Sequence, residues 1–311
     1  MTVRPFSQPL EGIIPPLATP LLDRDTLDVP GLERLVERAI NGGVAGLFVL
    51  GTTGEGPHLS YRLRRELITH ACRFARQRVP VLVGVTDTSV VELLGVSRHA
   101  AEVGAQGLVL APPYYLFVGQ PEFQEYLSRV VPELPLPVFL YNFPALTKVV
   151  YEMDTVKRML DQPNVAGMKD SSGNMTYFHR LVAAAKPRPD WTLVIGPEEL
   201  LEDAIFAGGH GGVNGGANLF PELYVALHRA AKAGDHARVR LLKSVVMDVS
   251  ENIYHVGRHE SSIIKGIKCG LRCLGVCDDF MTEPFNRFRE PERTRVAQLV
   301  ERIQDRLKTV L

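Results

Sequence analysis

The sequence predicts an α/β protein that folds as a (β/α)8 TIM barrel with a C-terminal helical appendage. Three observations support this: eight short apolar runs recur up to about residue 220, helix-period segments separate them, and the runs then stop. Buried parallel strands are continuous apolar runs, and each crossover with its helix needs about 30 residues. We therefore expect a catalytic barrel over residues 1–220 and a helical subdomain over residues 221–311.

The eight runs are the predicted barrel strands, and the central residues of successive runs lie 20 to 34 positions apart. They occupy residues 12–20, 45–51, 79–85, 107–113, 137–144, 165–169, 192–197 and 211–216. Apolar residues at helical spacing follow the first two runs: Leu32, Leu35, Val36 and Ala39, then Leu63, Leu67, Ala71 and Phe74. An open doubly wound sheet is the alternative. The barrel is favoured because the G-x-G-x-x-G fingerprint is absent, even from the glycine-rich residues 208–216.

The chain after residue 220 has helical patterning to its end. No low-complexity linker precedes it. We therefore expect the appendage to pack directly on the barrel.

Composition excludes two classes of partner. Lys+Arg and Asp+Glu both number 35, so the formal net charge is zero and no field attracts nucleic acid or an anionic membrane. Neither a signal-peptide h-region nor an apolar run of about 18 residues is present. We expect a cytoplasmic protein that binds a small molecule.

Three of the four cysteines, Cys269, Cys273 and Cys277, are spaced by four residues. This spacing places them on one helical face, whereas zinc ribbons and knuckles use C-x2-C pairs and would need a second cluster. Free cysteine also behaves as a small buried hydrophobe. We interpret these residues as core packing and expect neither a metal nor a cofactor.

Polar residues stand where the predicted strands end, which in a barrel is the face that carries chemistry. In chain order they are Thr19, the turn 51–56 (GTTGEG), Tyr114 and Tyr115, Tyr141, Lys169, Glu198 and Glu199, and Asn214. By itself, a lysine at a strand end often extends its ammonium past its stem to water. His58 and His210 have no evident partner, and we interpret them as structural.

These residue types suit imine chemistry. A desolvated ammonium is costly, which favours the neutral amine as a nucleophile toward a ketone. The protonated imine then withdraws electrons from the adjacent C–C bond, while a tyrosine coupled to threonine hydroxyls can carry protons. Backbone N–H groups and hydroxyls of a G-T-T-G turn can hold a keto-acid carboxylate without an arginine.

Three motifs together, GTTGE from Gly51, YNFP from Tyr141 and GMKDSSG from Gly167, resemble the dihydrodipicolinate synthase / N-acetylneuraminate lyase superfamily. Members are pyruvate-dependent class I aldolases and lyases on (β/α)8 barrels, and the resemblance covers nearly the whole chain. It implies that Lys169 forms the Schiff base and Tyr141 is the general acid/base. It further implies that Thr52 and Thr53 relay protons and bind the carboxylate.

The resemblance also implies an assembly. In synthase members, a tyrosine that matches Tyr115 reaches into the site of a neighbouring subunit, so we expect a homo-oligomer, a tetramer or a dimer. The expected substrate-binding set is completed by Gly51, Ser171 and Asn214.

One departure from the synthase pattern concerns the substrate. Synthases carry an arginine shortly after the tyrosine, where this chain has Leu146. A leucine cannot make the bidentate pair that arginine makes with a carboxylate. The motif is closer to aldolases of 2-keto-3-deoxy sugar acids and to lyases of sialic-acid-like substrates. In such enzymes acidic residues bind substrate hydroxyls, and we expect Glu198 and Glu199 to do so.

Other outcomes stay open from sequence. One is 4-hydroxy-tetrahydrodipicolinate synthase activity, which condenses pyruvate with aspartate semialdehyde. Another is dehydration of a keto-deoxy sugar acid, which starts from the same imine. A different class is a non-catalytic keto-acid-binding regulator, although a binder would not need the nucleophile Lys169.

Overall fold

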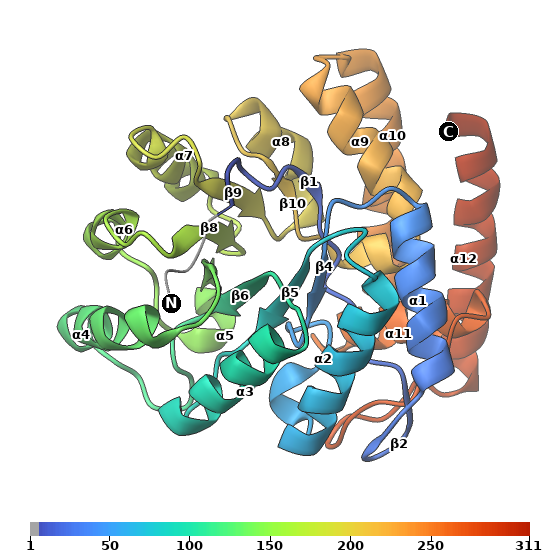
Figure 1. The fold of residues 1–311 in the computed structure, drawn as a ribbon. Helices are drawn as coiled ribbons and strands as arrows, with labels where there is room; N and C mark the ends of the chain where they lie inside the picture. The colour runs from blue at the N-terminus through green and yellow to red at the C-terminus, as the bar shows by residue number, and fades with distance from the viewer. Residues whose placement is uncertain (1–5) are drawn as a thin grey trace.

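The computed structural model describes residues 6–311, and it confirms the predicted barrel with helices packed around it (Figure 1). The barrel strands are β1 (Gly12–Ile13), β4 (Leu47–Val49), β5 (Val81–Gly84), β6 (Gly107–Leu110), β7 (Val138–Asn142), β8 (Val165–Asp170), β9 (Thr192–Ile195) and β10 (Gly211–Gly212). They are parallel and lie in the order β1-β10-β9-β8-β7-β6-β5-β4. A parallel bridge between Pro16, three residues after β1, and Phe48 of β4 closes the barrel.

The first and last strands are short for physical reasons. Pro15 and Pro16 follow β1 and have no N–H to donate, so regular pairing stops there. The chain still bonds across the closure, because the N–H of Leu17 donates to the carbonyl of Phe48 at 2.8 Å. On the other side of β1, a Cβ at Gly211 would lie 1.8 Å from the carbonyl oxygen of Gly12. Gly211, in the glycine-rich residues 208–216, therefore allows β10 to pack closely against β1.

Helices follow the strands around the barrel. They are α1 (Val29–Asn41), α2 (Tyr61–Ala75), α3 (Val90–Glu102), α4 (Gln120–Val130), α5 (Pro144–Thr147), α6 (Met153–Leu160), α7 (Met175–Ala185) and α8 (Leu201–Phe206). Several begin at a side-chain cap: Asp28, Ser60, Ser89 and Asn174 each accept a hydrogen bond from a backbone N–H of the first turn. A small hairpin of β2 (Leu21–Asp23) and β3 (Thr26–Leu27) follows β1 and was not predicted.

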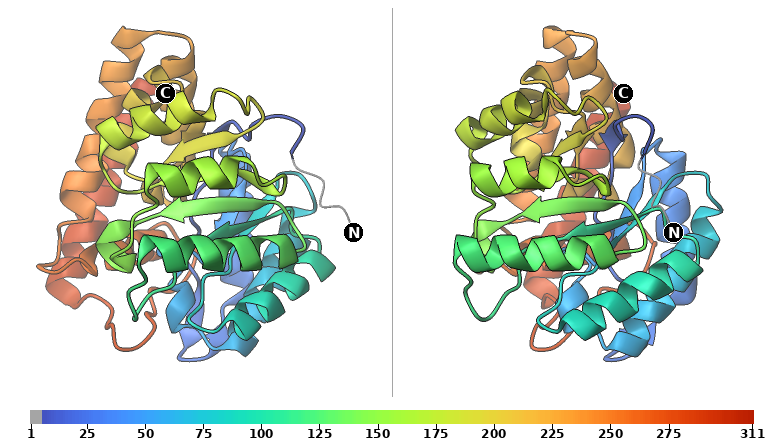
Figure 2. Two further views of the ribbon diagram at one scale, coloured as in Figure 1. Left: turned by 90° about the vertical axis from the view of Figure 1, so that its left-hand side faces the viewer. Right: turned by 60° about the vertical axis from the view of Figure 1, so that its left-hand side comes forward.

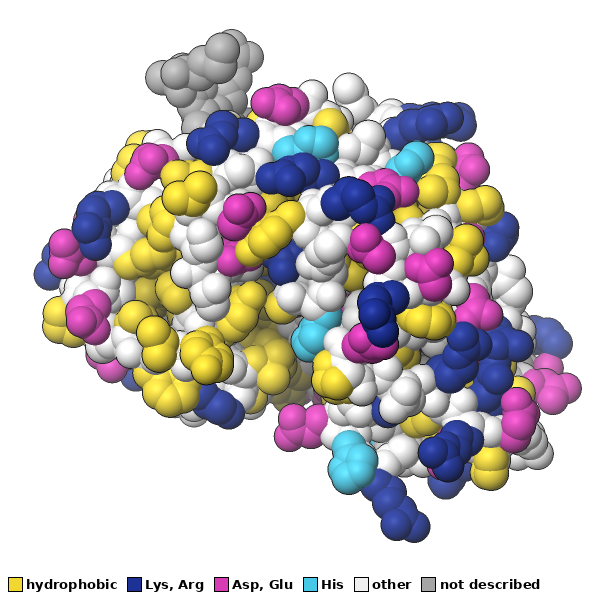
Figure 3. Space-filling model, turned by 90° about the horizontal axis from the view of Figure 1, so that it is seen from below, with side chains coloured by type: hydrophobic (Ala, Val, Ile, Leu, Met, Phe, Trp, Pro, Cys, Tyr) yellow, Lys and Arg dark blue, Asp and Glu magenta, His cyan; other side chains and the backbone are white. Residues whose placement is uncertain are grey.

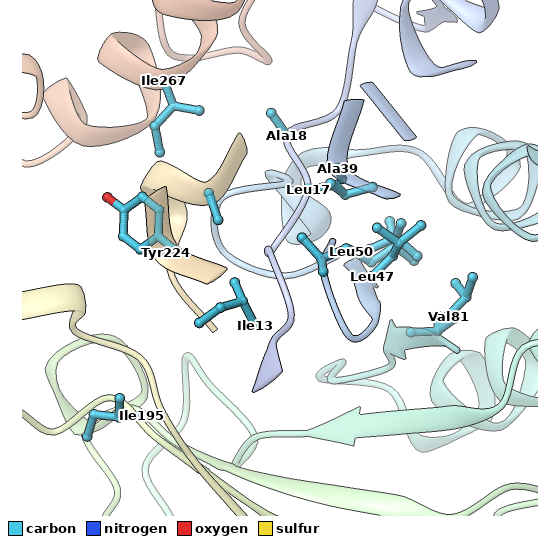
Figure 4. Packing of buried hydrophobic residues seen from close by; sticks show 14 of the residues in the cluster. Ile13, Leu17, Ala18, Ala39, Leu47, Leu50, Val81, Ile195, Tyr224 and Ile267 are labelled. Atoms are coloured by element: carbon cyan, nitrogen blue, oxygen red, sulfur yellow. The ribbon is translucent and has the colours of Figure 1, made fainter. Parts of the chain in front are cut away.

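Two apolar clusters hold the barrel. The larger lies between strands and helices and includes Leu47, Val81 and Ile195 (Figure 4). The smaller cluster includes Ile14, Phe48, Phe139, Tyr141 and Val194 from the strand region, with Phe6 and Leu10 packed against it. Because the strands are buried on both faces, their sequences are continuous apolar runs instead of alternating ones.

The C-terminal appendage, residues 221–311, is gathered on one side of the barrel (Figure 2). It comprises α9 (Pro221–Lys232), α10 (His236–Asp248), a π-helical segment (Val249–Ile253), α11 (Ser262–Cys273) and α12 (Glu290–Val310). The proposed boundary at residue 220 falls where α9 begins, but α9 packs on β1 and α8 and so completes the barrel wall.

The expectation of helix to the end of the chain is wrong for residues 254–261, which form turns and bends, and for residues 274–289, most of which are irregular. Gly275, at φ 71°, adopts a left-handed conformation just after α11 ends. Pro284 further disfavours helix in the second of these segments. The segment matters below because it contains Thr282.

Candidate active site

A cavity of about 450 Å³ lies at the carboxyl ends of β4, β5, β6 and β7. Seen from below, the molecule is hollowed between hydrophobic side chains (Figure 3). The cavity is lined by three predicted residues, Gly51, Thr52 and Tyr141, and by Leu146. This is the end of a (β/α)8 barrel where catalytic groups are found.

Lys169 and Tyr141 are neighbours across two strands. They are register partners of β8 and β7, so their side chains point to the same face. Lys169 Nζ lies 4.0 Å from the centroid of the Tyr141 ring and 5.2 Å from that of Phe48. Lys169 is only 6% exposed, and no carboxylate of residues 6–311 pairs with its Nζ. The side chain is therefore mostly buried, and its nitrogen lies against two aromatic rings.

The next register pair, Asn142 and Asp170, fixes the two strands from outside the barrel. Asn142 donates its side-chain amide to Asp170 at 2.8 Å, and the carbonyl of Asn142 accepts from the N–H of Ser171. Burial raises the pKa of Asp170, partly offset by hydrogen bonds from Asn142 and Ser172. Successive residues of a strand face opposite sides, so the bond between Asn142 and Asp170 lies outside the barrel while Tyr141 and Lys169 face inward. This buried hydrogen bond helps to fix the register that pairs Tyr141 with Lys169.

The turn after β4 brings a threonine hydroxyl to the tyrosine. Thr52 Oγ1 lies 3.4 Å from the Tyr141 hydroxyl oxygen, at the long end of hydrogen-bonding distance. The turn is tight: a Cβ at Gly56 would lie 2.3 Å from the carbonyl oxygen of Leu50. Thr53 follows Thr52 and is partly buried, but it does not line the cavity.

Several polar groups of the cavity were missed or interpreted otherwise from sequence. His58 lines the cavity and packs on Phe285 with ring centroids 5.3 Å apart, although we had interpreted it as structural. Tyr114 and Thr86 also line it. The position of Tyr114 at a strand end was the only sequence signal among these.

A buried ion pair forms part of the same wall. Arg64 lines the cavity and donates to Asp87 at 2.8 Å, and Asp87 also accepts from the hydroxyl of Tyr61. The guanidinium of Arg64 further donates to the carbonyls of Leu59 and Pro57. The charge of Arg64 is thus paired with protein groups.

Tyr115 is placed away from this site within its own chain. Its backbone has φ 80°, a left-handed conformation that costs a bulky residue about 1–3 kcal/mol. Its side chain is 86% exposed, next to Leu116 at 74% and Phe117 at 72%. An exposed apolar segment of this kind is typical of a protein–protein contact.

Glu198 is buried in a polar network. It accepts hydrogen bonds from the hydroxyl of Tyr254 at 2.8 Å, from the N–H of Gly216 at 3.0 Å and from the hydroxyl of Tyr224. Burial raises its pKa to about 7, although these hydrogen bonds act in the opposite direction. Both oxygens are engaged by protein donors, so contact with substrate hydroxyls would require this network to open.

The other predicted substrate ligands differ in their contacts. The backbone carbonyl of Glu199 accepts from the ammonium of Lys243, and the carboxylate of Glu199 is left without a hydrogen bond to the described residues. Asn214 is fully buried, and its amide donates to the carbonyl of Gly196 at 3.0 Å. Its Oδ1 has no partner among the described residues. Ser171 lies directly after β8, with Lys169 two positions before it.

The raised pKa of Glu198 predicts an unusual pH dependence of stability. Between the ordinary value of 4.5 and about 7, the folded chain holds a proton that the unfolded chain has lost. The free energy of unfolding should therefore fall as pH rises through this window, by up to about 3 kcal/mol. Glu198→Gln should remove this fall, as measured by urea unfolding at pH 5 and pH 8.

Glu251→Gln is the matched control for this measurement, because Glu251 is exposed. It should keep the pH dependence of the unmodified protein. Identical pH dependence in Glu198→Gln and the unmodified protein would contradict the assignment.

The predicted core packing of the cysteines is confirmed for Cys269 and Cys277, which are buried. It is wrong for Cys273, the last residue of α11, which is exposed. Within residues 6–311, no group of three or more His, Cys, Asp or Glu side chains is arranged to hold a metal ion. In the same part of the chain, no helix has the length and apolar character needed to cross a membrane.

Comparison with known proteins places the chain in a family. The sequence profile of the dihydrodipicolinate synthetase family matches residues 9–303. The Escherichia coli K12 protein named probable 2-dehydro-3-deoxy-D-pentonate aldolase YjhH is 33% identical over 85% of this chain and 87% of its own length.

Two solved structures are similar throughout. Dihydrodipicolinate synthase of Bacteroides thetaiotaomicron is 50% identical, with a TM-score of 0.92 over 97% of this chain and 100% of that chain. YagE of Escherichia coli K12, solved in complex with pyruvate, is 29% identical, with a TM-score of 0.89 over 94% and 98% of the two chains. Since the family profile extends over nearly the whole sequence, this chain belongs to the dihydrodipicolinate synthetase family.

Proposed function

We propose that the protein is a class I lyase that makes or breaks a C–C bond through a Schiff base with a 2-keto acid. The observation that carries this proposal is the triad of Lys169, Tyr141 and Thr52: a buried amine, a tyrosine paired with it across two strands, and a hydroxyl 3.4 Å from that tyrosine. Membership of the family and the pyruvate complex of YagE support pyruvate as the keto-acid partner.

The mechanism begins with attack of neutral Lys169 on the ketone. Tyr141 delivers a proton to the resulting oxyanion, and loss of water gives the protonated imine. In the cleavage direction, a base removes the proton of the C4 hydroxyl, the C3–C4 bond breaks, and its electrons move into the imine to give an enamine. The aldehyde leaves, C3 is protonated, and hydrolysis of the imine releases pyruvate and restores Lys169.

The turn 51–53 would hold the carboxylate of the keto acid. Gly51 and Thr52 line the cavity, whereas Thr53, the next residue of the turn, does not. Backbone N–H groups and hydroxyls of such turns bind anions without a basic side chain. Thr52 then has two tasks, which are to bind the substrate and to exchange protons with Tyr141.

The other end of the substrate is inferred to be uncharged. Leu146 lines the cavity and is 49% exposed, so an apolar side chain occupies the position of the synthase arginine. The polar side chains Thr86, Tyr114 and His58 suit hydroxyl groups. A 2-keto-3-deoxy sugar acid or a sialic-acid-like substrate fits this distribution best, in line with the name of YjhH as a probable 2-dehydro-3-deoxy-D-pentonate aldolase. Glu199 stays a candidate for a substrate hydroxyl.

We also infer a homo-oligomer in which the exposed residues 115–117 form part of a contact between subunits. The conformation and exposure of Tyr115 support this, because an aromatic side chain held outward at positive φ is available to a neighbouring site. The tetrameric state and the cytoplasmic location stay predictions.

A substrate panel tests the proposed function. We expect pyruvate release from 2-keto-3-deoxy sugar acids or sialic acid, and only weak condensation of pyruvate with aspartate semialdehyde. Efficient condensation would refute the inference that Leu146 disfavours synthase activity, and it would favour the synthase. Loss of substrate without pyruvate release would indicate a dehydratase. Absence of a borohydride-trapped pyruvate adduct would favour the non-catalytic regulator.

A further inference from the structure

Glu55 connects the catalytic turn to the appendage. It lies three residues after Thr52, and its Oε1 accepts a hydrogen bond from Lys268 Nζ of α11 at 2.7 Å. Neither side chain of this ion pair is exposed, with 0% for each. Oε2 of Glu55 accepts from the N–H and the hydroxyl of Thr282 at 2.9 and 2.7 Å. Both carboxylate oxygens are therefore bonded to the appendage.

A fully buried ion pair needs an explanation other than stability. Removing two charges from water is costly, and a well-packed apolar pair of similar volume is often as stable. An ion pair whose carboxylate oxygens are all hydrogen-bonded fixes the orientation of its side chains, because charge-assisted hydrogen bonds are short and angle-dependent. Glu55 is thus held at one position relative to α11 and Thr282.

That position is transmitted to Thr52 through the backbone of the turn. The N–H of Glu55 donates to the carbonyl of Thr52 at 3.0 Å, and the N–H of Gly56 donates to that of Gly51 at 3.2 Å. Glu55 itself has φ 55°, an uncommon conformation that surrounding contacts must maintain. The 3.4 Å separation of Thr52 Oγ1 and the Tyr141 hydroxyl leaves little tolerance for a shift of this turn.

We propose that Glu55 and Lys268 are positioning residues that hold the Thr52 hydroxyl within proton-transfer distance of Tyr141. The proposal rests on the Schiff-base function above. It assigns the appendage a part in catalysis, because α11 and Thr282 set the geometry of a turn in the barrel more than 200 residues earlier. Neither residue lines the cavity.

The test compares two neutralised ion pairs. Glu55→Gln/Lys268→Met removes the charges of the buried pair without leaving one charge unpaired. The control is Glu11→Gln/Lys232→Met, which neutralises a partly exposed pair that joins the start of the barrel to α9 of the appendage, away from the turn. The folded state of both variants is checked by circular dichroism.

Pyruvate alone is the probe. Borohydride trapping reports imine formation at Lys169, and the exchange of the pyruvate methyl protons in D2O, followed by proton NMR, reports proton transfer at C3. We expect Glu55→Gln/Lys268→Met to keep the trapped adduct but to slow methyl exchange about 10- to 100-fold, because misplacement reduces catalysis on this scale. The control should stay within about twofold of the unmodified protein on the same argument.

Backbone hydrogen–deuterium exchange provides a readout that needs no activity. Amides of residues 51–56 should exchange faster in the Glu55/Lys268 variant than in the unmodified protein. Their exchange rates in the control should equal those of the unmodified protein. A folded Glu55/Lys268 variant with normal methyl exchange would overturn the proposal, as would equal losses in both variants. If the unmodified protein gives neither adduct nor methyl exchange, the proposed function is wrong. The amide exchange of residues 51–56 would then still show whether the Glu55–Lys268 pair holds the turn in place.

Discussion

Lys169→Ala will abolish the borohydride-trapped pyruvate adduct and lower turnover by at least about 10⁴-fold. The amine is the only group of the proposed mechanism that forms a covalent bond to the substrate, so its loss removes the whole imine route. The adduct is measured by mass spectrometry of the intact chain and of its peptides, and turnover by pyruvate release.

Lys186→Ala is the control for this substitution. Lys186 follows α7 and is exposed, so its removal deletes the same atoms without touching the site. It should keep both the adduct and the turnover. An adduct that persists in Lys169→Ala, or that maps to another lysine, would show that the nucleophile has been misassigned.

Tyr141→Phe should lower turnover by about 10²- to 10⁴-fold, the usual contribution of a general acid/base. The substitution removes the hydroxyl that pairs with Thr52 and keeps the ring, which stacks on Phe143 and lies against Lys169. Folding should therefore be little changed, and the loss should appear in the rates of both imine formation and pyruvate methyl exchange.

Two comparisons sharpen this prediction. Tyr126→Phe removes a buried hydroxyl that has no hydrogen-bond partner within residues 6–311, and it should leave activity unchanged. If Thr52 and Tyr141 act as one relay, adding Thr52→Val to Tyr141→Phe should cause little further loss. Multiplicative losses in the double variant would mean that the two hydroxyls act independently.

The barrel was predictable because its signals are local. A strand buried on both faces must be apolar along its whole length, and a crossover must be long enough to carry a helix, so both leave a pattern within about 30 residues. The polar residues at the strand ends followed from the same pattern, and this brought Lys169, Tyr141 and Thr52 into one hypothesis. The prediction of helix was wrong for residues 274–289, because the helical patterning on either side of this segment gave no sign that Gly275 and Pro284 interrupt it.

Contacts between distant segments were not predictable. Nothing near Glu55 indicates that its carboxylate meets Lys268, and nothing near Glu198 indicates that Tyr224 and Tyr254 will donate to it. Such pairs depend on where the appendage packs, which is decided by burial of apolar surface over the whole molecule. The same holds for His58, whose place in the cavity depends on how the turn after β4 folds.

The sequence by itself determined the barrel and the face on which the polar strand ends gather, whereas the roles of Lys169 and Tyr141 came from the family resemblance and stay predictions. The barrel and this face follow from the alternation of strands and helices and from which residues end each strand. Only the tertiary structure decided that the carboxylate of Glu198 accepts hydrogen bonds from protein donors and that Tyr115 is exposed. It also decided that the turn 51–56 is bonded to α11 through Glu55. The physical reason is that a hydrogen bond needs two groups within about 3 Å, and local sequence places only one of them.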